Sequence, residues 1–579
     1  MLLPYAAYNA TDDKRTSPGV PWWRGHRIVL VSVQSLVPCP ARARGTPRRA
    51  EAAQPPGRKA RPGGQRRHTR PEKEGHAPGG PDRVLRGEWG VVRQPRVKIV
   101  ILGGGPGGYE AALVAAQLGA DVTVVDSGGL GGACVLTDCV PSKTLIATSE
   151  TMGLLHGSAG LGITIAGHRG GVGRVAGGQR PAGGPPPGPG HEAADSVSVD
   201  APRLYARVKA LARAQSADVA TRLAAEGVKV ITGRGRLAGP HTVIAGDREV
   251  SADVVLVATG GTPRVLPGAQ PDGERILSWR HLYDLDELPA ELIVVGSGVT
   301  GAEFASAYQA LGSQVTLVSS RDHVLPHEDA DAAVVVEDVF RRRGMTVLSR
   351  SRAEGVRRER SGVVVTLADG RTVRGSHCLL TVGLVPATTG LGLAEAGVAL
   401  DGQGFVQVDK VSRTSAPGVY AAGDCTGVMM LASVAAMQGR IAMWHALGEA
   451  VQPLRLGHVA ATIFTEPEIA TVGVDQAAVE SGQVEADVVK LALATNARAK
   501  MQGFRDGFVK LFARHGSGTV LGGVVVAPRA SELILAVSLA VEQLLTVDQI
   551  AHTFAVYPSL SGSLTEAARR LMAPTPGGR

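Results

Sequence analysis

Short apolar runs alternate with alanine-rich stretches along the chain from residue 97 onward. The apolar runs are rich in β-branched residues and lack polar interruptions, which predicts strands that are buried on both faces. The expected strands cover residues 97–102, 121–125, 228–231, 254–257, 292–295 and 315–318. Helices are expected between them, among others over 202–226 and 431–448. This alternation is typical of an α/β protein.

A glycine-rich loop follows the first expected strand and leads into a helix. Gly103 permits the tight turn, Gly105 lets the backbone approach a pyrophosphate, and Gly108 lets the helix pack on the strand. Asp126 ends the next strand, where its carboxylate can accept hydrogen bonds from a ribose. Strand, loop, helix and acid together predict a dinucleotide-binding βαβ unit.

A second unit of the same kind begins at residue 292. Gly296, Gly298 and Gly301 repeat the loop pattern, and the strand 315–318 follows the helix. Two such units predict two bound nucleotides, so that electrons can pass from one nucleotide to the other.

The residues after the strand 315–318 bear on the choice of nicotinamide coenzyme. An acid there would bind a free 2′-hydroxyl group and repel a 2′-phosphate, but this chain has Ser319 and, two positions later, Arg321. The missing acid and the nearby arginine favour NADPH. Arg321 could instead be an ordinary exposed loop residue, so the use of NADH stays open.

Two cysteines lie in the stretch G-G-A-C-V-L-T-D-C-V-P-S-K, which covers residues 131–143. If the stretch begins a helix, Cys134 and Cys139 are about one turn apart, so their sulfurs could form a disulfide that opens and closes. A helix N-terminus and a nearby lysine would favour a thiolate. The alternative from the pair alone is two small buried cysteines that never react.

The net charge of +9 belongs to the N-terminal part of the chain. Residues 1–96 contain twelve more basic than acidic residues, which leaves −3, the difference between +9 and +12, for residues 97–579. We therefore expect no nucleic-acid partner for the globular part. Residues 1–94 lack sustained apolar periodicity and are expected to be a disordered basic extension, with a nucleic-acid or membrane-binding tail as the alternative.

Residues 166–195 are rich in glycine, proline and arginine, and they predict a flexible insertion in a surface loop. A polyproline docking segment is the alternative. The apolar patch at 28–37 is too short to span a bilayer and too far from the start for a good signal peptide. Five cysteines in 579 residues fit a reducing compartment. We expect a cytoplasmic protein without an integral membrane segment or a metal site.

The two glycine loops and the cysteine stretch together resemble the FAD-dependent pyridine nucleotide-disulfide oxidoreductases, the family of lipoamide dehydrogenase and glutathione reductase. The resemblance implies two Rossmann-like three-layer domains and a C-terminal α+β dimerisation domain. It places an FAD domain at 97–286, an NAD(P) domain at 287–390, a central FAD segment at 391–452 and the dimerisation domain at 453–572. It also implies a homodimer whose subunits complete each other's active sites.

The resemblance also implies roles for individual residues. Cys134 would be the interchange thiol, Cys139 would face the flavin, and Lys143 would lie near flavin N5 and pair with Glu303. Further matching positions would contact the nucleotides, namely Gly260, Gly423 and Asp424 for FAD and Gly383 for NAD(P).

The chain departs from the disulfide reductases of this family near its end. Where they carry H-P-x-x-S-E, this chain has Tyr557 and Gly562. A phenol with an ordinary pKa of about 10 is a poor base at neutral pH, and glycine cannot orient one. His552 lies nearby but does not match the catalytic position.

The pattern therefore resembles the quinone-reductase branch of the family. We expect NAD(P)H to reduce FAD and a quinone then to take the electrons near the partner's Tyr557, in a ping-pong reaction. Tyr557 could donate a hydrogen bond to the quinone or could simply pack at the interface. Dihydrolipoamide dehydrogenase, soluble transhydrogenase and a non-enzymatic flavin-bound interaction protein are the alternatives.

Overall fold

The computed structural model describes residues 96–163 and 197–572. The expected extension at 1–94 and the expected insertion at 166–195 both lie outside the described residues. All described residues belong to one unit of the chain, which begins at residue 91.

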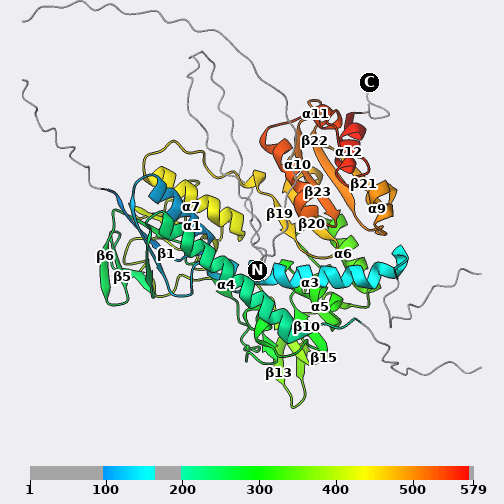
Figure 1. Cartoon of the computed structure of the whole chain (residues 1–579), viewed down its shortest axis with the longest axis horizontal. Coiled ribbons are helices and arrows are strands. Elements are labelled where there is room, and N and C mark those ends of the chain that lie inside the picture. Colours follow the sequence, from blue (N-terminus) through cyan, green and yellow to red (C-terminus); the bar gives the residue numbers. More distant parts are fainter. Residues whose placement is uncertain (1–95, 164–196, 573–579) are drawn as a thin grey trace, which may run out of the picture. The chain divides into compact units, whose positions relative to one another are not determined.

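The first sheet has five parallel strands in the order β18-β7-β1-β2-β3. In chain order the strands are β1 (Lys98–Leu102), β2 (Asp121–Asp126), β3 (Lys229–Thr232), β7 (Val254–Val257) and β18 (Val419–Ala421). The helices α1 (Pro106–Gln117), α4 (Ala201–Ala225) and α7 (Ala432–Ala446) accompany this sheet, and α1 and α7 lie side by side (Figure 1).

Successive side chains of β1 point to two different cores, which explains why its sequence is apolar at nearly every position. Ile99 and Ile101 pack into the core that contains residues of α1, α4 and α7. Val100 and Leu102 point to the opposite face and pack against the meander β4 (Gly235–Leu237), β5 (Thr242–Ala245) and β6 (Arg248–Ser251). Because successive side chains point to opposite faces, a strand covered on both sides must be apolar throughout.

The second sheet repeats this plan in the order β12-β11-β10-β16-β9. Its strands are all parallel and comprise β9 (Ile276–Leu277), β10 (Glu291–Val295), β11 (Gln314–Val318), β12 (Thr346–Leu348) and β16 (His377–Leu380). The helices α5 (Val299–Ala310) and α6 (Ala330–Arg342) follow β10 and β11. Leu292 and Val294 share a core with α5 and α6, and Ile293 and Val295 share one with the strand β14 (Val363–Leu367).

The third sheet is antiparallel, with the order β19-β20-β23-β22-β21. Its strands are β19 (Ala461–Ile463), β20 (Glu468–Gly473), β21 (Ala486–Ala492), β22 (Phe508–Arg514) and β23 (Val520–Ala527). One core joins this sheet to α10 (Ala530–Glu542), α11 (Val547–Ala551) and α12 (Gly562–Met572).

The remaining elements lie between or beside these strands and helices. They are α2 (Gly132–Leu136), α3 (Cys139–Gly157), η1 (Ser158–Leu161), β8 (Gly261–Pro263), η2 (Trp279–Asp284), β13 (Ala353–Arg358), β14 (Val363–Leu367), β15 (Thr372–Gly375), β17 (Leu384–Pro386), η3 (Asp424–Thr426), η4 (Leu456–His458), α8 (Gln476–Glu480), η5 (Leu493–Thr495) and α9 (Ala497–Met501). Among the described residues, no helix combines the length and apolar character needed to cross a membrane.

The expected strands and helices are all present within one or two residues of the expected bounds. The cysteine stretch differs from the expectation, because it does not form one helix. Cys134 lies in α2 and Cys139 begins α3, and Thr137 and Asp138 interrupt the helix between them. The backbone at Asp138, with φ −124° and ψ −97°, is not helical, so the chain turns between the two cysteines.

Candidate active site

The first glycine loop packs so closely that side chains are excluded from it. Gly103 has φ +105°, and a Cβ atom there would lie 2.3 Å from the carbonyl oxygen of Ala258. A Cβ atom on Gly108 would lie 1.9 Å from the carbonyl oxygen of Gly103. The α1 N-terminus has no side-chain cap. Pro106 has no N–H and the Gly108 N–H donates to the Gly105 carbonyl oxygen at 2.9 Å, so the Gly107 N–H is the group of this first turn that is suited to a pyrophosphate.

Asp126 is already engaged by the backbone around this loop. Its carboxylate accepts hydrogen bonds from the N–H groups of Gly104 at 2.7 Å, Gly128 at 2.8 Å and Gly129 at 2.5 Å. Asp126 thus holds the loop next to the turn that follows β2. The two oxygens of a carboxylate offer about four acceptor positions, so one remains for the expected ribose.

The turn Ala258-Thr259-Gly260 lies next to the first glycine loop, because the Ala258 N–H donates to the Leu102 carbonyl oxygen at 2.8 Å. Space is open where a Cβ atom on Gly260 would lie. Among the described residues the buried Thr259 hydroxyl has no oxygen or nitrogen partner, and it shares a hydrogen bond with the Cys425 thiol. Gly423 donates its N–H to Gln438 Oε1 at 2.8 Å, which fixes the turn before Asp424. The open space and the uncapped helix fit a nucleotide bound at this end of the first sheet.

The second glycine loop reproduces the first. A Cβ atom on Gly296 would lie 2.4 Å from the carbonyl oxygen of Thr381, and one on Gly301 would lie 1.9 Å from that of Gly296. Space is open at Gly298 and Gly383, and the α5 N-terminus has no side-chain cap. These positions are suited to the second nucleotide.

Ser319 and Arg321 differ in their accessibility to a coenzyme. The Ser319 side chain is fully buried, and its hydroxyl shares a 2.7 Å hydrogen bond with the hydroxyl of Ser297 in the glycine loop. It also accepts the N–H of Arg321 at 3.1 Å. Ser319 therefore braces the loop, whereas the Arg321 side chain is exposed and no ion pair involves it within the described residues.

Cys134 and Cys139 come together despite lying on different helices. Both are free thiols that are partly buried, and a side-chain hydrogen bond joins them. That hydrogen bond lowers the pKa of Cys134, because it stabilises the Cys134 thiolate, and it raises the pKa of Cys139 for the reciprocal reason. Lys143 also favours both thiolates, but its effect is smaller than that of the thiol partner.

Lys143 and Glu303 form an ion pair between α3 and α5. Lys143 Nζ lies 2.8 Å from Glu303 Oε2, and the Glu303 side chain is only 5% exposed. Glu303 Oε1 accepts the backbone N–H of Phe464 at 2.9 Å, and Lys143 Nζ lies 4.9 Å from the centre of the Phe464 ring. Burial would lower the pKa of Lys143, but the charge of Glu303 and the hydrogen bond to it raise that pKa overall.

Two further carboxyl groups lie near the thiols. Burial raises the pKa of Asp138, and the positive charge of Lys143 only partly offsets this effect. Burial, and secondarily the charge of Asp138, raises the pKa of Asp424 to about 6. The sequence showed Asp138 between the cysteines, but nothing local indicated that its charge would reach Asp424 on η3.

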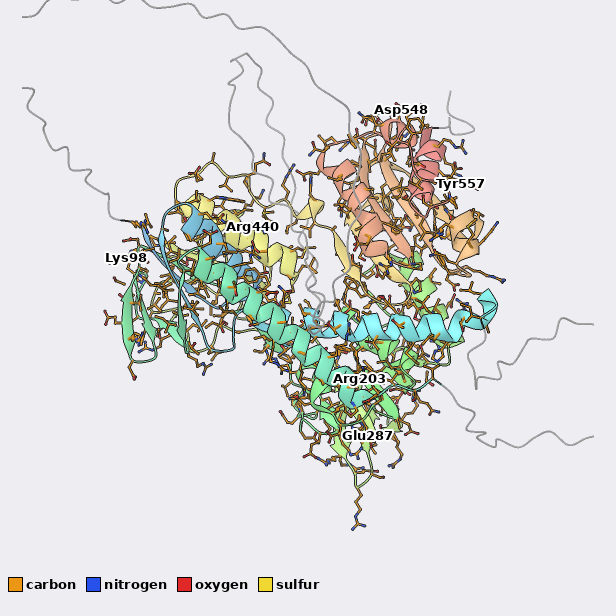
Figure 2. The ribbon with its side chains drawn as sticks, in the orientation of Figure 1. Lys98, Arg203, Glu287, Arg440, Asp548 and Tyr557 are labelled. Atoms are coloured by element: carbon orange, nitrogen blue, oxygen red, sulfur yellow. The ribbon has the colours of Figure 1, made fainter. Side chains whose placement is uncertain are left out.

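The remaining sequence candidates lie apart from this cluster. Tyr557 is 86% exposed on the domain that carries the antiparallel sheet, as Figure 2 shows. Gly562 begins α12. His552 is exposed directly after α11, as its C-cap, and its Nδ1 atom contacts the carbonyl oxygen of Asp548 at 2.8 Å.

Sequence reasoning missed two contributions to the site. Phe464 appears in the sequence only as part of a matching motif, yet it holds both members of the Lys143–Glu303 pair. Glu110 on α1 accepts two hydrogen bonds from Arg440 on α7, at 3.0 and 2.6 Å. Glu110 and Arg440 are 330 positions apart, so no local pattern could have joined them.

Two dinucleotide loops, a thiol pair and a lysine–glutamate pair between them define an oxidoreductase with two nucleotide sites. Comparison with known families agrees with this class. The pyridine nucleotide-disulphide oxidoreductase family matches residues 97–439, and the dimerisation domain of the same family matches residues 459–568. The chain belongs to the pyridine nucleotide-disulphide oxidoreductases.

Individual relatives cover most of the chain. An "NAD(P)H dehydrogenase (quinone)" of Mycobacterium tuberculosis is 55% identical over 82% of this chain and 94% of its own length. A "dihydrolipoyl dehydrogenase" of Chlorobaculum tepidum is 32% identical over 81% of this chain and 96% of its own length. The crystal structure of LpdA from M. tuberculosis, at 55% identity, matches with a TM-score of 0.74 over 82% of this chain and 100% of that one.

A more distant structure shows the same fold. The HOCl-induced flavoprotein disulfide reductase RclA from Escherichia coli is 23% identical over 82% of this chain and 99% of its own, with a TM-score of 0.69. Members of the family use FAD and NAD(P)H, and this chain is an FAD-dependent oxidoreductase that uses a nicotinamide coenzyme. Its open glycine positions and uncapped helices fit both cofactors.

Proposed function

We propose that the protein is an NAD(P)H:quinone oxidoreductase that acts as a cytoplasmic homodimer. One observation carries the proposal: the Lys143–Glu303–Phe464 arrangement is complete, whereas Tyr557 and Gly562 stand where disulfide reduction requires an acid–base pair. The 55% identical relative that is named a quinone dehydrogenase supports it.

Two separate sets of residues would bind the two nucleotides. The α1 N-terminus, Asp126, Gly260, Gly423 and Asp424 would hold FAD, which when bound supplies the two-electron chemistry. The loop from Gly296 to Gly301, with Gly383, would hold the nicotinamide coenzyme, and exposed Arg321 favours NADPH over NADH.

Lys143 would keep a fixed positive charge beside the redox centre. Glu303 holds its ammonium group at 2.8 Å and is itself held by the Phe464 N–H group, so the charge is oriented before any coenzyme binds. A preoriented charge needs no reorganisation when negative charge develops nearby. Because the pKa of Lys143 is raised, it stays protonated throughout the neutral range.

The thiol pair favours a second candidate, dihydrolipoamide oxidation, since Cys134 and Cys139 are in contact. Without a base in place of Tyr557, general acid–base assistance worth a factor of about 100 to 10,000 would be lost. The proposal therefore places the dithiol outside the route of the electrons to quinone.

Steady-state turnover tests the proposal, with NADPH or NADH as donor and menadione, benzoquinone or lipoamide as acceptor. We expect quinone turnover to exceed lipoamide turnover by at least about 100-fold, because the missing acid–base pair slows disulfide chemistry by at least that factor. Faster turnover of lipoamide would refute the proposal. Hydride exchange between NADPH and an NAD analogue at a comparable rate would instead identify a transhydrogenase.

The variant Cys134→Ser separates the two routes. Quinone reduction is expected to persist in this variant, and any disulfide reduction is expected to disappear. Cys378→Ser is the matched control, because Cys378 is fully buried in β16 away from the thiol pair. Loss of quinone reduction in Cys134→Ser alone would place the dithiol on the route.

A further inference from the structure

A groove of about 800 Å³ runs along one face of α7. Its α7 wall consists of Ser433, Val434, Met437, Ile441 and Trp444, whose spacing places them on one side of the helix. The facing wall is the connection 449–455 with residues 458–460, and Leu118 and Glu542 complete the lining. We call this feature the α7 groove.

The walls of the α7 groove are mostly apolar and partly open to solvent. Leu118 is 40% exposed and Met437 is 38% exposed, and Val451 and Leu454 face them from the connection. Apolar side chains that line an accessible groove gain free energy when an apolar ligand displaces the water. The groove is therefore suited to an apolar ligand.

The facing wall is tied to the antiparallel domain. Glu542, at the end of α10, accepts a hydrogen bond from Arg455 and shares a 2.7 Å hydrogen bond with His458 Nδ1. These contacts hold the connection 449–455 at a distance from α7, and the groove lies between them. Arg455, His458 and Glu542 also line the groove, where they are paired with one another.

The other side of α7 adjoins the proposed FAD site. A Cβ atom on Gly439 would lie 2.1 Å from the carbonyl oxygen of Gly107, so α7 touches the dinucleotide-binding helix directly. A Cβ atom on Gly423 would lie 3.2 Å from the Cβ atom of Ala435. The first turns of α7 therefore contact the turn before Asp424, and the end of the groove at Ser433 lies next to that turn.

The α7 groove is long as well as apolar. Ser433 and Trp444 are eleven positions apart, which corresponds to about 16 Å along a helix. A single quinone ring would fill only part of that length. An acceptor with its ring at the proposed flavin site and an alkyl chain along α7 would use all of it.

We propose that the α7 groove binds the hydrocarbon tail of a lipid-type quinone and so selects tailed quinones as acceptors. This inference rests on the proposed quinone reductase function. It adds a chemical class of substrate, because the acceptor would carry an isoprenoid or alkyl chain in addition to its ring.

Two acceptors with the same ring test the proposal. Ubiquinone-0 has no tail and decylubiquinone has a ten-carbon tail, so tail binding is the difference between them. With the FAD-loaded full-length protein and saturating NADPH, we expect kcat/KM to be at least tenfold higher for decylubiquinone, because each buried methylene group strengthens binding several-fold. Equal values for the two quinones would overturn the inference while leaving quinone reduction intact.

Met437→Glu places a charge in the α7 groove and should bring the ratio of the two kcat/KM values to within threefold of one. Met437→Leu should restore the preference, since the volume and the apolar character are kept. Val334→Glu is the matched control, because Val334 is a 46% exposed apolar residue on α6 outside the groove. It should keep the wild-type ratio. A wild-type ratio in Met437→Glu would overturn the inference.

Trp444 provides a measurement that does not depend on turnover. Decylubiquinone should quench its fluorescence saturably in the oxidised protein, ubiquinone-0 should not at equal concentration, and Trp444→Phe should lose the saturable signal. Quenching without saturation would count against a site.

If Met437→Glu changed the oligomeric state in light scattering, the groove would be covered by a second copy of the chain and the inference would fail. If neither quinone were reduced while NADPH bleached the flavin, the proposed function would fail first.

Discussion

Tyr557 and Gly562 lie five positions apart in the segment that enters α12. The resemblance to disulfide reductases assigns these positions to a histidine that moves protons and a glutamate that orients it. In this chain the segment is held by other contacts, since Asn496 Nδ2 donates to the Ser559 carbonyl oxygen at 3.0 Å and the Gly562 N–H donates to Ser559 Oγ at 3.1 Å. These two contacts hold the backbone between Tyr557 and Gly562.

Restoring that pair with Tyr557→His and Gly562→Glu should increase the rate of lipoamide reduction by about 100-fold or more. The change is sterically acceptable, because a Cβ atom at position 562 would lie 3.5 Å from Ser559 Oγ, an ordinary contact. Steady-state assays with NADH and lipoamide measure the gain. Tyr557→Phe with Gly562→Ala is the matched control. No gain in the histidine–glutamate variant would count against a redox-competent Cys134–Cys139 pair.

Asp424 should make FAD binding depend on pH. Its pKa is raised to about 6 by burial and by Asp138, so in the FAD-free site it carries a proton below that pH. If the ionised carboxylate accepts a hydrogen bond from FAD, binding must release this proton. The apparent Kd should then rise as pH falls below about 6, approaching tenfold per pH unit.

Equilibrium dialysis of FAD at pH 5 to 8 measures this dependence. Asp424→Asn should bind FAD more weakly at pH 8 and with little change between pH 5 and 7. Asp284→Asn is the control, since Asp284 is 67% exposed on η2. An unchanged pH profile in Asp424→Asn would show that another group titrates.

At the scale of whole elements, a buried ion cluster joins α6 to β22. Lys510 Nζ lies 2.7 Å from Asp329 Oδ2 and 2.7 Å from Asp331 Oδ2, and the side chains of Lys510 and Asp329 are almost fully buried. Asp329 also caps α6, because its Oδ1 accepts the Ala332 N–H at 3.2 Å. The second nucleotide domain is thus connected to the antiparallel sheet through a helix cap.

Lys510→Met should lower the free energy of unfolding by about 3–5 kcal/mol, because it leaves the buried Asp329 carboxylate without a counter-charge. Lys490→Met removes a 48% exposed partner of Asp331 and should cost less than about 1 kcal/mol. Urea denaturation measures both. Adding Asp329→Asn to Lys510→Met should recover part of the loss, because asparagine is neutral and still caps a helix. A further loss in the double variant would contradict this account.

At the scale of the whole molecule, an apolar surface on α10 is our candidate for the contact between the subunits of the proposed homodimer. Leu535 and Leu539 are four positions apart on one face and are 60% and 53% exposed. Phe554 and Tyr557, in the segment after α11, are also exposed. These residues all belong to the region matched by the family's dimerisation domain, and covering them in a homodimer would remove a large apolar surface from water.

Leu539→Arg should shift the protein toward monomers, because an arginine tolerated at the surface of one subunit would be buried without a partner in the dimer. Size-exclusion chromatography with light scattering measures the subunit state, and quinone turnover should fall with the dimer fraction if the partner's Tyr557 completes the site. Val334→Arg on α6 should stay dimeric. A fully dimeric Leu539→Arg would place the interface elsewhere.

The sequence by itself determined the parts of this protein that local rules govern. Uninterrupted apolar runs such as 292–295 must be covered on both faces, so they predict the parallel sheets. Gly103 and Gly108 restrict the conformation of the turn between strand and helix, because a side chain at either position would clash with the backbone. The resemblance of the motifs to a known family supplied the cofactors and the expected Lys143–Glu303 pair. Composition and spacing alone could not have supplied either.

Only the tertiary structure decided which polar groups meet across long separations. Phe464 reaches Glu303 from 161 positions away, Lys510 reaches Asp329 from 181, and Arg440 reaches Glu110 from 330. Packing also turned Ser319 inward to Ser297 and formed the α7 groove between a helix and a returning connection. These contacts depend on how whole domains pack against one another. The local periodicity of the chain gives no information about which distant side chains become neighbours, so it could not predict them.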